Sequence, residues 1–500
     1  MINKETKSGV SVAHGAALMM LLKMFERSIG LISTLILARV LTPADFGLVA
    51  MAMSVVGLTE LMGAFGFDVA IIQNQNAERK HYDTAWTFNV LFSVATAAVL
   101  LAVTYAASIF YKEPRLLYVL PVLALGALIA GFENIGTVNF RKHMDFKKEF
   151  RFLFFKRIAT FVITIIMALT FRSYWALVIG IVSGKLISVI ISYLLHEFRP
   201  RFSLAASAEF FHFSKWLFLS NLVLFIQNKS DSFILGRAVG AYDLGVYNIA
   251  SEIAVMPSTE FIAPINRAVF PAYSKLSVDL PALREKFLEV FGMIAIICLP
   301  ISVGLACVAD TAVAVLLGKQ WASAVPLMRI FAVCGLTSAL QSNLVLVIVA
   351  RGQPKANTMM SAGMLVLYLP LLMYGAIHYG VYGAAWVHLV MSVIVLIPLH
   401  LVFFRLIELR GAAYLGTLWR PLAGAAGMAA AVLAVRAAID GYLIHAAPLL
   451  ALIVYVAVGG LAYVAVVLLL WQLSGRPAAS AETNILRTLA GRLRRAPAPL

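Results

Sequence analysis

The sequence is short of charge, because only 13% of its 500 residues are Asp, Glu, Lys or Arg while 62% are hydrophobic. An average soluble domain carries about 25% charged residues. Apolar runs of about 20 residues recur along the chain between short polar joints, which is the pattern of membrane-spanning helices. The composition excludes a soluble protein and predicts an all-α, polytopic membrane protein.

Cysteine and catalytic motifs are also scarce. The three cysteines, Cys298, Cys307 and Cys334, lie in apolar runs with no CxxC pair and no metal-ligand spacing, so we interpret them as small hydrophobic residues. The sequence contains no Gly-rich phosphate loop, no GxSxG and no HExxH motif. We therefore expect no enzyme activity, no bound metal and no cofactor.

Charge is unevenly placed, with a formal net charge of +16. Most Lys and Arg residues outside the apolar runs fall in the termini and the even-numbered joints, so the positive-inside rule places both termini in the cytoplasm. The basic joint RKHMDFKKEFR and the tail RTLAGRLRRAP are interpreted as topology signals and anionic-lipid contacts rather than nucleic-acid sites. We predict fourteen spans, at residues 17–38, 46–71, 86–110, 116–138, 150–171, 174–195, 214–236, 246–270, 288–309, 324–349, 357–378, 381–404, 417–438 and 448–471.

The chain contains an internal repeat. ARVLTPADFGLV at residues 38–49 matches GRAVGAYDLGVY at residues 236–247 at an offset of 198 residues, so Asp45 aligns with Asp243 and Gly47 with Gly245. We interpret these residues as turn chemistry, with Asp as a helix N-cap and Gly at a tight bend. Each repeat covers six spans in parallel orientation, an arrangement that transporters use to hold a substrate between two lobes.

The repeat predicts the domain organisation. We expect two parallel six-helix lobes, an appended lipid-facing helix pair and a basic cytoplasmic tail. Their boundaries are the N-terminal lobe at 1–205, the C-terminal lobe at 206–408, the helix pair at 409–474 and the tail at 475–500.

Charged residues nevertheless occur inside the predicted spans, above all between Lys215 and Lys275. An ionised group at mid-bilayer costs about 2.5–3.5 kcal/mol, so such groups usually face a bundle interior or a hydrated cavity. At 100° per residue, Glu252 and Glu260 are about 80° apart and Glu260 and Arg267 about 20° apart, which places all three on one side of a helix. Pro257 and Pro264 are expected to break this helix between the charged groups.

Other predicted spans also carry charge. Lys23, Glu26 and Arg27 lie in the first span; they exclude a cleavable signal peptide there, and Arg27 is the deeper cation. For Lys23 and Arg267, extension of the side chain to the membrane surface is an alternative to a cavity role. For Lys229 and Asp231 the alternative is that each neutralises a charge on a neighbouring helix. Lys156, Arg157, Lys185, Lys215 and Arg329 are assigned no role, because we place them near the ends of spans.

We expect these groups, from the first, second, seventh and eighth helices, to line one hydrated cavity. Cations would hold an anionic headgroup, since the Arg fork can donate two hydrogen bonds to a diphosphate. Carboxylates would bind a coupling ion. The predicted substrate-binding residues are Lys23, Arg27, Lys229, Arg267 and Asn266. The predicted coupling or gating residues are Glu26, Glu60, Asp68, Asp231, Glu252, Glu260, Pro257 and Pro264, with Glu60 and Asp68 repeating the spacing of Glu252 and Glu260.

Four segments resemble a known family: LARVLTPADFGLVAMAMSV, GFDVAIIQ, HYDTAWTFNV and EIAVMPSTEFIAPINRAVFPAYSKL. Over about residues 15–410 the chain resembles the Wzx-like flippases of the multidrug/oligosaccharidyl-lipid/polysaccharide exporter superfamily. The resemblance implies two lobes, a cationic central cavity, alternating access and residence in the bacterial inner membrane. It also implies export of a polyprenyl-diphosphate-linked oligosaccharide for exopolysaccharide, capsule or O-antigen assembly, with polysaccharide polymerase and chain-length or export machinery as partners, and it leaves coupling to H⁺ or Na⁺ open.

Two alternatives remain. A cation-coupled multidrug exporter of the same superfamily is expected to have a cavity dominated by carboxylates, which the cations here disfavour. A membrane polysaccharide polymerase or ligase is expected to have a long outward loop, and no joint on that side of this sequence is long.

Overall fold

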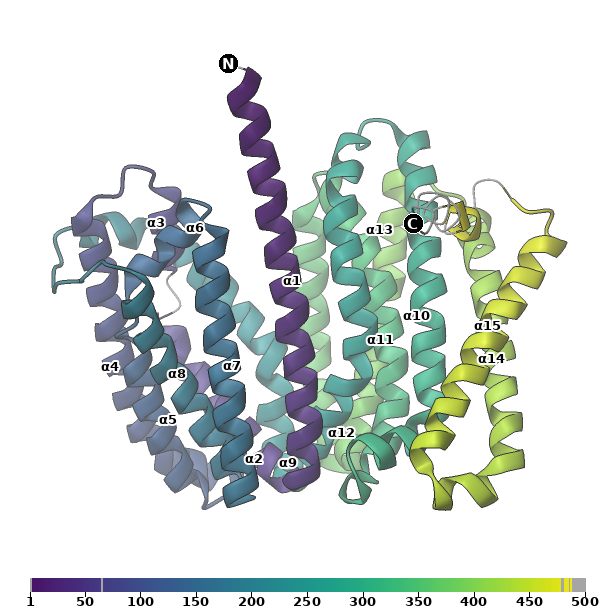
Figure 1. Cartoon of the computed structure of the whole chain (residues 1–500), viewed down its shortest axis with the longest axis horizontal. Helices are drawn as coiled ribbons and strands as arrows, with labels where there is room; N and C mark the ends of the chain where they lie inside the picture. The colour runs from purple at the N-terminus through teal and green to yellow at the C-terminus, as the bar shows by residue number, and fades with distance from the viewer. Residues whose placement is uncertain (1, 64–65, 478–480, 485, 488–500) are drawn as a thin grey trace, which may run out of the picture. The chain divides into compact units, whose positions relative to one another are not determined.

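The chain is almost entirely helical (Figure 1), and its structure is a computed structural model that describes residues 2–63, 66–477, 481–484 and 486–487. Within these residues there are α-helices and short 3₁₀ helices and no strand. Eight helices of the described chain are long and apolar enough to cross a membrane, or nine if the bent pair Leu116–Ala130 and Ile135–Lys142 forms one span. The prediction of an all-α, multi-pass membrane protein is confirmed, whereas the total of fourteen spans stays a prediction.

The chain divides into two compact units, Met1–Gly245 and Val246–Leu500. The division falls inside the long helix α9 (Ser207–Lys275), a few residues after a break at Gly240, whose φ of 85° and ψ of −178° are not helical. This break lies between the predicted seventh and eighth spans. The lobe boundaries expected from the repeat stay predictions, and each unit is described by itself.

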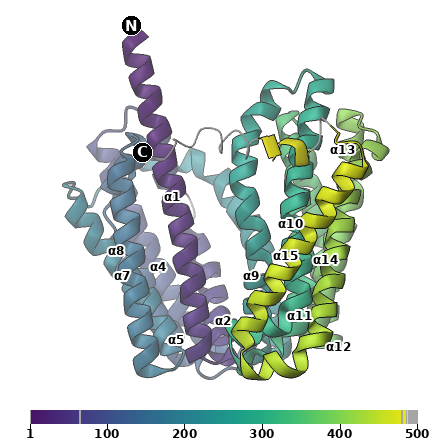
Figure 2. The same cartoon turned by 45° about the vertical axis from the view of Figure 1, so that its right-hand side comes forward.

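Unit 1 is a bundle in which α4, α5, α7 and α8 run side by side and α1 packs along α7 (Figures 1 and 2). Small residues allow the close approach, since Gly180 and Gly184 of α8 face Thr164 and Thr160 of α7. The elements that precede α9 in this unit are α1 (Ile2–Val40), α2 (Pro43–Glu60), η1 (Leu61–Gly63), α3 (Phe67–Gln73), α4 (Arg79–Tyr111), α5 (Leu116–Ala130), η2 (Ile135–Thr137), α6 (Val138–Lys142), α7 (Phe146–Phe171) and α8 (Trp175–Leu195).

Unit 2 has an aromatic core in which Phe287 and Phe291 of α10 stack together and contact Phe403 and Tyr414. The last two helices form an antiparallel pair that packs on α10 (Figure 2), in part through Tyr455, which is fully buried. The elements after α9 are α10 (Leu280–Leu316), η3 (Lys319–Trp321), α11 (Ala324–Ala350), α12 (Pro354–Ile394), α13 (Leu396–Ile407), α14 (Gly411–Ala446) and α15 (Pro448–Leu473).

Two predicted helices differ from the structure. The span expected at 46–71 is not one helix: α2 ends at Glu60, a 3₁₀ turn follows, and Gly66, with a φ of 66°, stands directly before α3. The span expected at 116–138 is likewise bent by 64° between α5 and the short helices that follow it. Both breaks follow from the backbone at particular residues, which hydropathy does not register.

Pro257 and Pro264 do not break α9, so this expectation was wrong. The helix is continuous from beyond Gly240 to Lys275 through both prolines. A proline inside a helix removes one backbone hydrogen bond and can bend the helix without ending it.

Candidate functional site: charged groups within the spans

The charged group of α1 is partly paired. Lys23 Nζ lies 3.0 Å from Glu26 Oε2, and Arg157 of α7 donates a hydrogen bond of 3.4 Å to the Glu26 carbonyl oxygen. Arg27 is exposed on the same stretch of α1 and stands about 20 Å along the helix axis from Val40. Arg27 is therefore an exposed guanidinium within the predicted first span.

Glu60 pairs with a cation to which the sequence assigned no role. Lys185 Nζ lies 3.6 Å from Glu60 Oε1. Lys185 stands midway along α8, which runs from Trp175 to Leu195 and is one of the membrane-spanning candidates. The placement of Lys185 near a span end was wrong, and its position at the centre of the predicted 174–195 segment was the signal that could have identified it. The pair therefore lies beside the middle of a candidate membrane-spanning helix.

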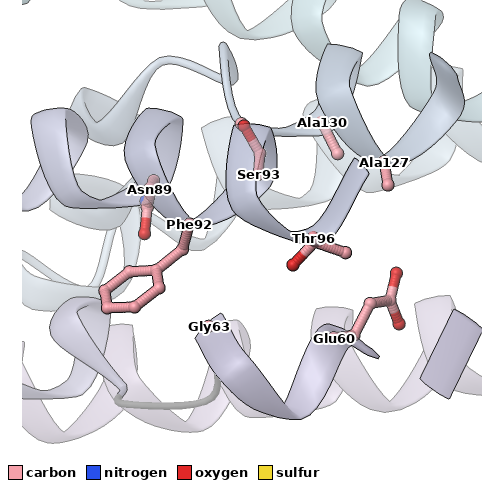
Figure 3. A pocket seen from close by; sticks show the side chains of 9 residues that line it. Glu60, Gly63, Asn89, Phe92, Ser93, Thr96, Ala127 and Ala130 are labelled. Atoms are coloured by element: carbon pink, nitrogen blue, oxygen red, sulfur yellow. The ribbon is translucent and has the colours of Figure 1, made fainter. Parts of the chain in front are cut away.

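A pocket opens beside this ion pair (Figure 3), with a volume of about 230 Å³. Its polar lining comes from Glu60 and from Asn89, Ser93 and Thr96 of α4. Phe92 lines another part of it, and small residues at the end of α5 complete the wall. We call this cavity the Glu60 pocket.

Asp68 does not share a helix with Glu60, contrary to the expected eight-residue repeat on one helix. It lies in the first turn of α3, after the break at Gly66, and accepts a hydrogen bond of 2.9 Å from Arg141 Nη2. Arg141 belongs to the basic joint that was interpreted as a lipid contact. Asp68 therefore neutralises one of the cations of that joint.

Lys229 and Asp231 are half-buried on the part of α9 that belongs to unit 1. Ser230 and Ser232 next to them are buried, and the Ser230 hydroxyl has no hydrogen-bond partner among the described residues. This stretch therefore places charged and polar groups side by side inside an otherwise apolar helix.

In unit 2, α9 carries three of the predicted charged site residues. Glu252 and Arg267 are exposed and Glu260 is half-buried, whereas Ile253 and Ile262 are buried. The predicted common side of Glu252, Glu260 and Arg267 stays a prediction, because the buried Ile253 stands seven residues from Glu260 and so lies on nearly the same side of the helix.

Asn266 belongs to a polar chain inside unit 2. Its Nδ2 donates to Ser342 Oγ at 2.9 Å, and its Oδ1 accepts from Asn343 Nδ2 at 3.3 Å. Asn343 is fully buried and accepts from the Tyr273 hydroxyl at 3.3 Å. Both ends of the Asn266 amide are thus engaged within the protein. The sequence did not identify Asn343 or Tyr273, because a single polar residue in an apolar run carries no periodic signal.

The two copies of the repeat meet at their glycines. A Cβ atom added to Gly47 would lie 1.7 Å from the Ala241 carbonyl oxygen, and one added to Gly245 would lie 1.9 Å from the Pro43 carbonyl oxygen. Since Pro43 and Ala241 are also related by 198 residues, the contact is reciprocal. The start of α2 and the corresponding turn of α9 therefore cross backbone to backbone.

We expected Asp45 to be the N-cap of α2, and this was wrong. Asp45 is instead the capping-box partner of the N-cap residue. Thr42 is the N-cap, and its backbone N–H and hydroxyl donate to Asp45 Oδ2 at 2.8 and 2.7 Å. The other carboxylate oxygen accepts from the Tyr174 backbone N–H at 3.1 Å. One buried carboxylate thus connects the starts of α2 and α8.

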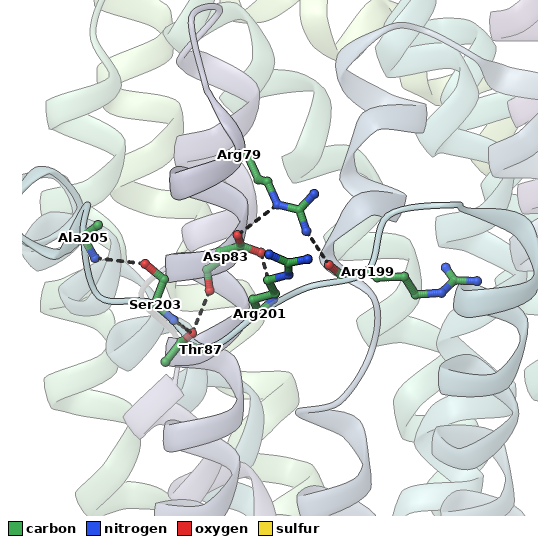
Figure 4. Close-up of polar contacts among 7 residues, drawn as sticks. All are labelled: Arg79, Asp83, Thr87, Arg199, Arg201, Ser203 and Ala205. Carbon is green, nitrogen blue, oxygen red and sulfur yellow. Dashed lines mark hydrogen bonds and ion pairs between the residues drawn. The ribbon is translucent and has the colours of Figure 1, made fainter.

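The segment between α8 and α9 is fastened to the Arg79 end of α4 (Figure 4). Asp83 Oδ1 accepts from the Arg201 backbone N–H at 2.9 Å, and Asp83 Oδ2 lies 3.4 Å from Arg79 Nε. Arg79 also donates to the Arg199 carbonyl oxygen at 2.9 Å, and the Ser203 backbone N–H donates to Thr87 Oγ1 at 2.9 Å. This segment, 196–206, is therefore held along unit 1.

His196 begins that segment. Its Nδ1 accepts from the Phe198 backbone N–H at 3.0 Å, and the Phe198 carbonyl oxygen accepts from Asn134 Nδ2 at 2.7 Å. Burial, and next the nearby charge of Lys148, lower the pKa of His196 from its ordinary value of 6.5. The neutral imidazole is the form that accepts the Phe198 hydrogen bond.

Exposed cations and carboxylates occur in both units, Arg27 and Glu60 in unit 1 and Arg267 and Glu252 in unit 2. No group of three or more His, Cys, Asp or Glu residues in the described part of the chain could hold a metal ion. The predicted convergence of the charged groups on one cavity stays a prediction, because the residues are distributed over two units.

Comparisons with known proteins identify relatives over most of the chain. A family model described as "Polysaccharide biosynthesis protein" matches residues 36–326. The "Teichuronic acid biosynthesis protein TuaB" of Bacillus subtilis (strain 168) is 26% identical over 403 residues, which cover 80% of this chain and 83% of that protein. The "Lipopolysaccharide biosynthesis protein WzxC" of Escherichia coli (strain K12) is 23% identical over 404 residues, or 79% and 81% of the two chains.

Solved structures share the fold. A lipid II flippase MurJ in an inward closed conformation matches with a TM-score of 0.72 at 12% identity, covering 90% of this chain and 98% of that chain. An inward-facing multidrug resistance MATE family transporter matches with a TM-score of 0.55 at 14% identity, covering 77% and 96%. The helices described above therefore form a transporter fold.

Proposed function

Because the chain belongs to the family of polysaccharide biosynthesis proteins, we propose that it is a flippase for polyprenyl-diphosphate-linked oligosaccharide repeat units. It carries them across the bacterial inner membrane by alternating access, for exopolysaccharide, capsule or O-antigen assembly. The observation that carries this proposal is the set of charged side chains kept on open faces of apolar helices, Arg27 in unit 1 and Glu252 and Arg267 in unit 2. A bundle with only a structural role would avoid the cost of such groups.

The relatives support the substrate class. TuaB and WzxC are named for the biosynthesis of teichuronic acid and of lipopolysaccharide, and the neighbour with the TM-score of 0.72 is named a lipid II flippase. A further relative, 24% identical over 299 residues, is named a succinoglycan biosynthesis transport protein, ExoT of Rhizobium meliloti (strain 1021). On this proposal the protein transports its substrate and does not transform it chemically.

In the proposed mechanism the cations hold the diphosphate. Arg27 and Arg267 are exposed, and each guanidinium can donate two parallel hydrogen bonds to phosphate oxygens. Lys229 adds a half-buried charge, whereas Lys23 is partly neutralised by Glu26. Asn266, engaged with Ser342 and Asn343, positions the turn of α9 that carries Arg267.

Carboxylates supply the coupling and gating groups. Glu252, Glu260 and Arg267 lie in one stretch of α9, so binding of H⁺ or Na⁺ to these carboxylates changes the charge that the diphosphate meets. Glu60 and Asp68 are ion-paired with Lys185 and Arg141, and Asp231 lies beside Lys229.

We place both termini of the protein in the cytoplasm. We also propose that a polysaccharide polymerase and chain-length machinery are among its partners.

The proposal predicts the effect of reversing two charges. We expect Arg27→Glu and Arg267→Glu each to lower polymer production at least tenfold with unchanged amounts of folded protein in the membrane, because a carboxylate repels the diphosphate. Polymer is measured in cells that lack the chromosomal copy. Arg405→Glu, an exposed arginine in the last turn of α13, is the matched control and should leave production unchanged. Normal production in both cavity variants would refute the anion-binding roles.

A cation-coupled multidrug exporter is the rival that shares the fold. Exposed arginines at depth in both units oppose binding of cationic drugs, so this rival predicts that the charge reversals improve rather than abolish transport. Drug resistance of cells that carry the variants distinguishes the two functions.

A further inference from the structure

We propose that the Glu60 pocket binds one sugar ring of the transported repeat unit and thereby contributes to the choice of substrate. This inference rests on the proposed flippase function and adds a subsite to it. The pocket lies within unit 1, between the end of α2, the middle of α4 and the end of α5 (Figure 3).

The depth of the pocket suits the hydrophilic part of a substrate in transit. Glu60 pairs with Lys185, which stands at the centre of a 21-residue membrane-spanning helix. Asn89, Ser93 and Thr96 occupy the middle stretch of α4, a helix of 33 residues. A ring of polar groups at this level, surrounded by apolar helices, is the feature expected where a polar solute crosses a membrane.

The net charge of the pocket favours a neutral ligand. The Glu60 carboxylate lies 3.6 Å from the Lys185 ammonium, so the carboxylate charge is already balanced. A metal ion or a cationic drug would have to compete with that ammonium, and a phosphate would be repelled by the carboxylate. An uncharged polar ligand meets neither penalty.

The polar groups that line the Glu60 pocket require a ligand that donates hydrogen bonds. Ser93 Oγ donates to the Val90 carbonyl oxygen at 2.8 Å, and Thr96 Oγ1 donates to the Thr59 carbonyl oxygen at 3.3 Å. Both hydroxyl protons are therefore used, and each oxygen keeps lone pairs that can accept. The Glu60 carboxylate also accepts, and the Asn89 amide can both accept and donate. Several hydroxyl groups on one ligand match this set, as a sugar ring provides them.

Size and shape point to a single ring. The volume of about 230 Å³ is below the roughly 300–1,000 Å³ of pockets for drug-sized ligands. Phe92, whose ring stacks on Phe67 at a centroid distance of 6.0 Å, gives the pocket an apolar wall against which the C–H face of a sugar can lie. An amphipathic ligand with one apolar face and a hydroxylated rim fills such a site.

The test measures binding to the purified full-length protein in lipid nanodiscs. The probes are undecaprenyl diphosphate without sugar and the same lipid carrying one glucose, galactose or N-acetylglucosamine residue. We expect at least one sugar-bearing lipid to bind the wild type about three- to tenfold more tightly than the bare lipid, the worth of one hydrogen bond or a little more. Asn89→Ala and Thr96→Val should abolish that difference while leaving the affinity for the bare lipid unchanged.

Two further variants keep the outcome interpretable. Thr104→Val removes the same hydroxyl from the same helix outside the pocket, since Thr104 donates to the Leu100 carbonyl oxygen at 2.8 Å, and it should preserve the sugar-dependent difference. Gly63→Val adds a side chain to the pocket without removing a polar group. The first carbon of that side chain fits, because its nearest neighbour would be Phe92 Cβ at 3.5 Å. This variant should lose the difference as well.

The failures are distinguishable. If the wild type binds the bare lipid but no sugar-bearing lipid more tightly, or if the pocket variants keep the difference, the sugar site is refuted and the flippase function stands. If the wild type binds neither the bare nor the sugar-bearing lipids, both are refuted.

Discussion

At the scale of single residues, polar groups in apolar helices have two different fates in this protein. Some form hydrogen bonds within the protein, as Asn266 does with Ser342 and Asn343. Others have exposed side chains, as Arg27 and Arg267 do. The sequence alone ranks both kinds equally, because the cost of burying a polar group depends on a partner that another helix supplies.

His196 provides a prediction at this scale, because its neutral form accepts the Phe198 backbone N–H that holds the 196–206 segment. Burial and then Lys148 lower its folded-state pKa below the 6.5 of the unfolded chain, with Glu197 and Arg199 acting in opposite directions. The stability from the neutral form is present in full above about pH 6.5 and is lost as the pH falls through the folded-state pKa. We therefore expect the amides of 196–206 to be less protected from hydrogen exchange at pH 5.5 than at pH 7.5, after correction for the intrinsic exchange rate.

The control for this prediction is a second histidine. His196→Gln should remove the pH dependence of protection in the segment, whereas His143→Gln, which changes an exposed histidine, should retain it. Equal pH dependence in the wild type and His196→Gln would contradict the role of His196.

Lys185 shows how a residue-scale prediction fails. From the sequence we assign Lys185 no role, because we place it near a span end, yet Lys185 lies at the centre of α8 and pairs with Glu60. The segment 174–195 was itself predicted correctly, so the information was in the sequence. The partner of Lys185 could not be predicted, because Glu60 and Lys185 are 125 positions apart and come together only because α2 and α8 both pack on α5.

At the scale of elements, the crossing of α2 and α9 gives the sharpest prediction. We expect Gly47→Ala and Gly245→Ala each to lower the free energy of unfolding by about 1–3 kcal/mol, because the new Cβ meets a backbone carbonyl oxygen that cannot move aside as a side chain would. Thermal unfolding of the purified variants measures this loss. Gly363→Ala in α12 is the control, since no atom lies within 4 Å of its added Cβ. A wild-type midpoint for both crossing variants would show that the helices do not meet there.

Elements also show what hydropathy can and cannot predict. It predicted the order of the helices, because apolar length is what a membrane span requires. It also placed the joints near Gly240 and Gly380, where positive φ values interrupt α9 and α12. It missed the break at Gly66. The breaks expected at Pro257 and Pro264 came from proline chemistry and not from hydropathy, and they were wrong, because glycine and proline permit a bend and the surrounding packing decides whether it occurs.

At the scale of the whole molecule, the internal repeat is the feature from which most of the account follows. It predicts two similar halves, and the structure shows repeat-related residues, Gly47 and Gly245, facing each other's backbone. The family, its relatives and the fold agree with a transporter of lipid-linked oligosaccharides. The choice of sugar could not be predicted from the sequence, because the groups of the Glu60 pocket come from three separate helices.

The most direct test of the flippase function is to locate the lipid-linked repeat unit by membrane leaflet in cells with and without this protein. The account predicts that single lipid-linked units accumulate on the cytoplasmic leaflet when the protein is absent. Expression of the wild type, but not of Arg27→Glu or Arg267→Glu, should make the units appear on the periplasmic leaflet. Accumulation of single units on the periplasmic leaflet in the absence of the protein would contradict it and indicate a polymerase or ligase instead.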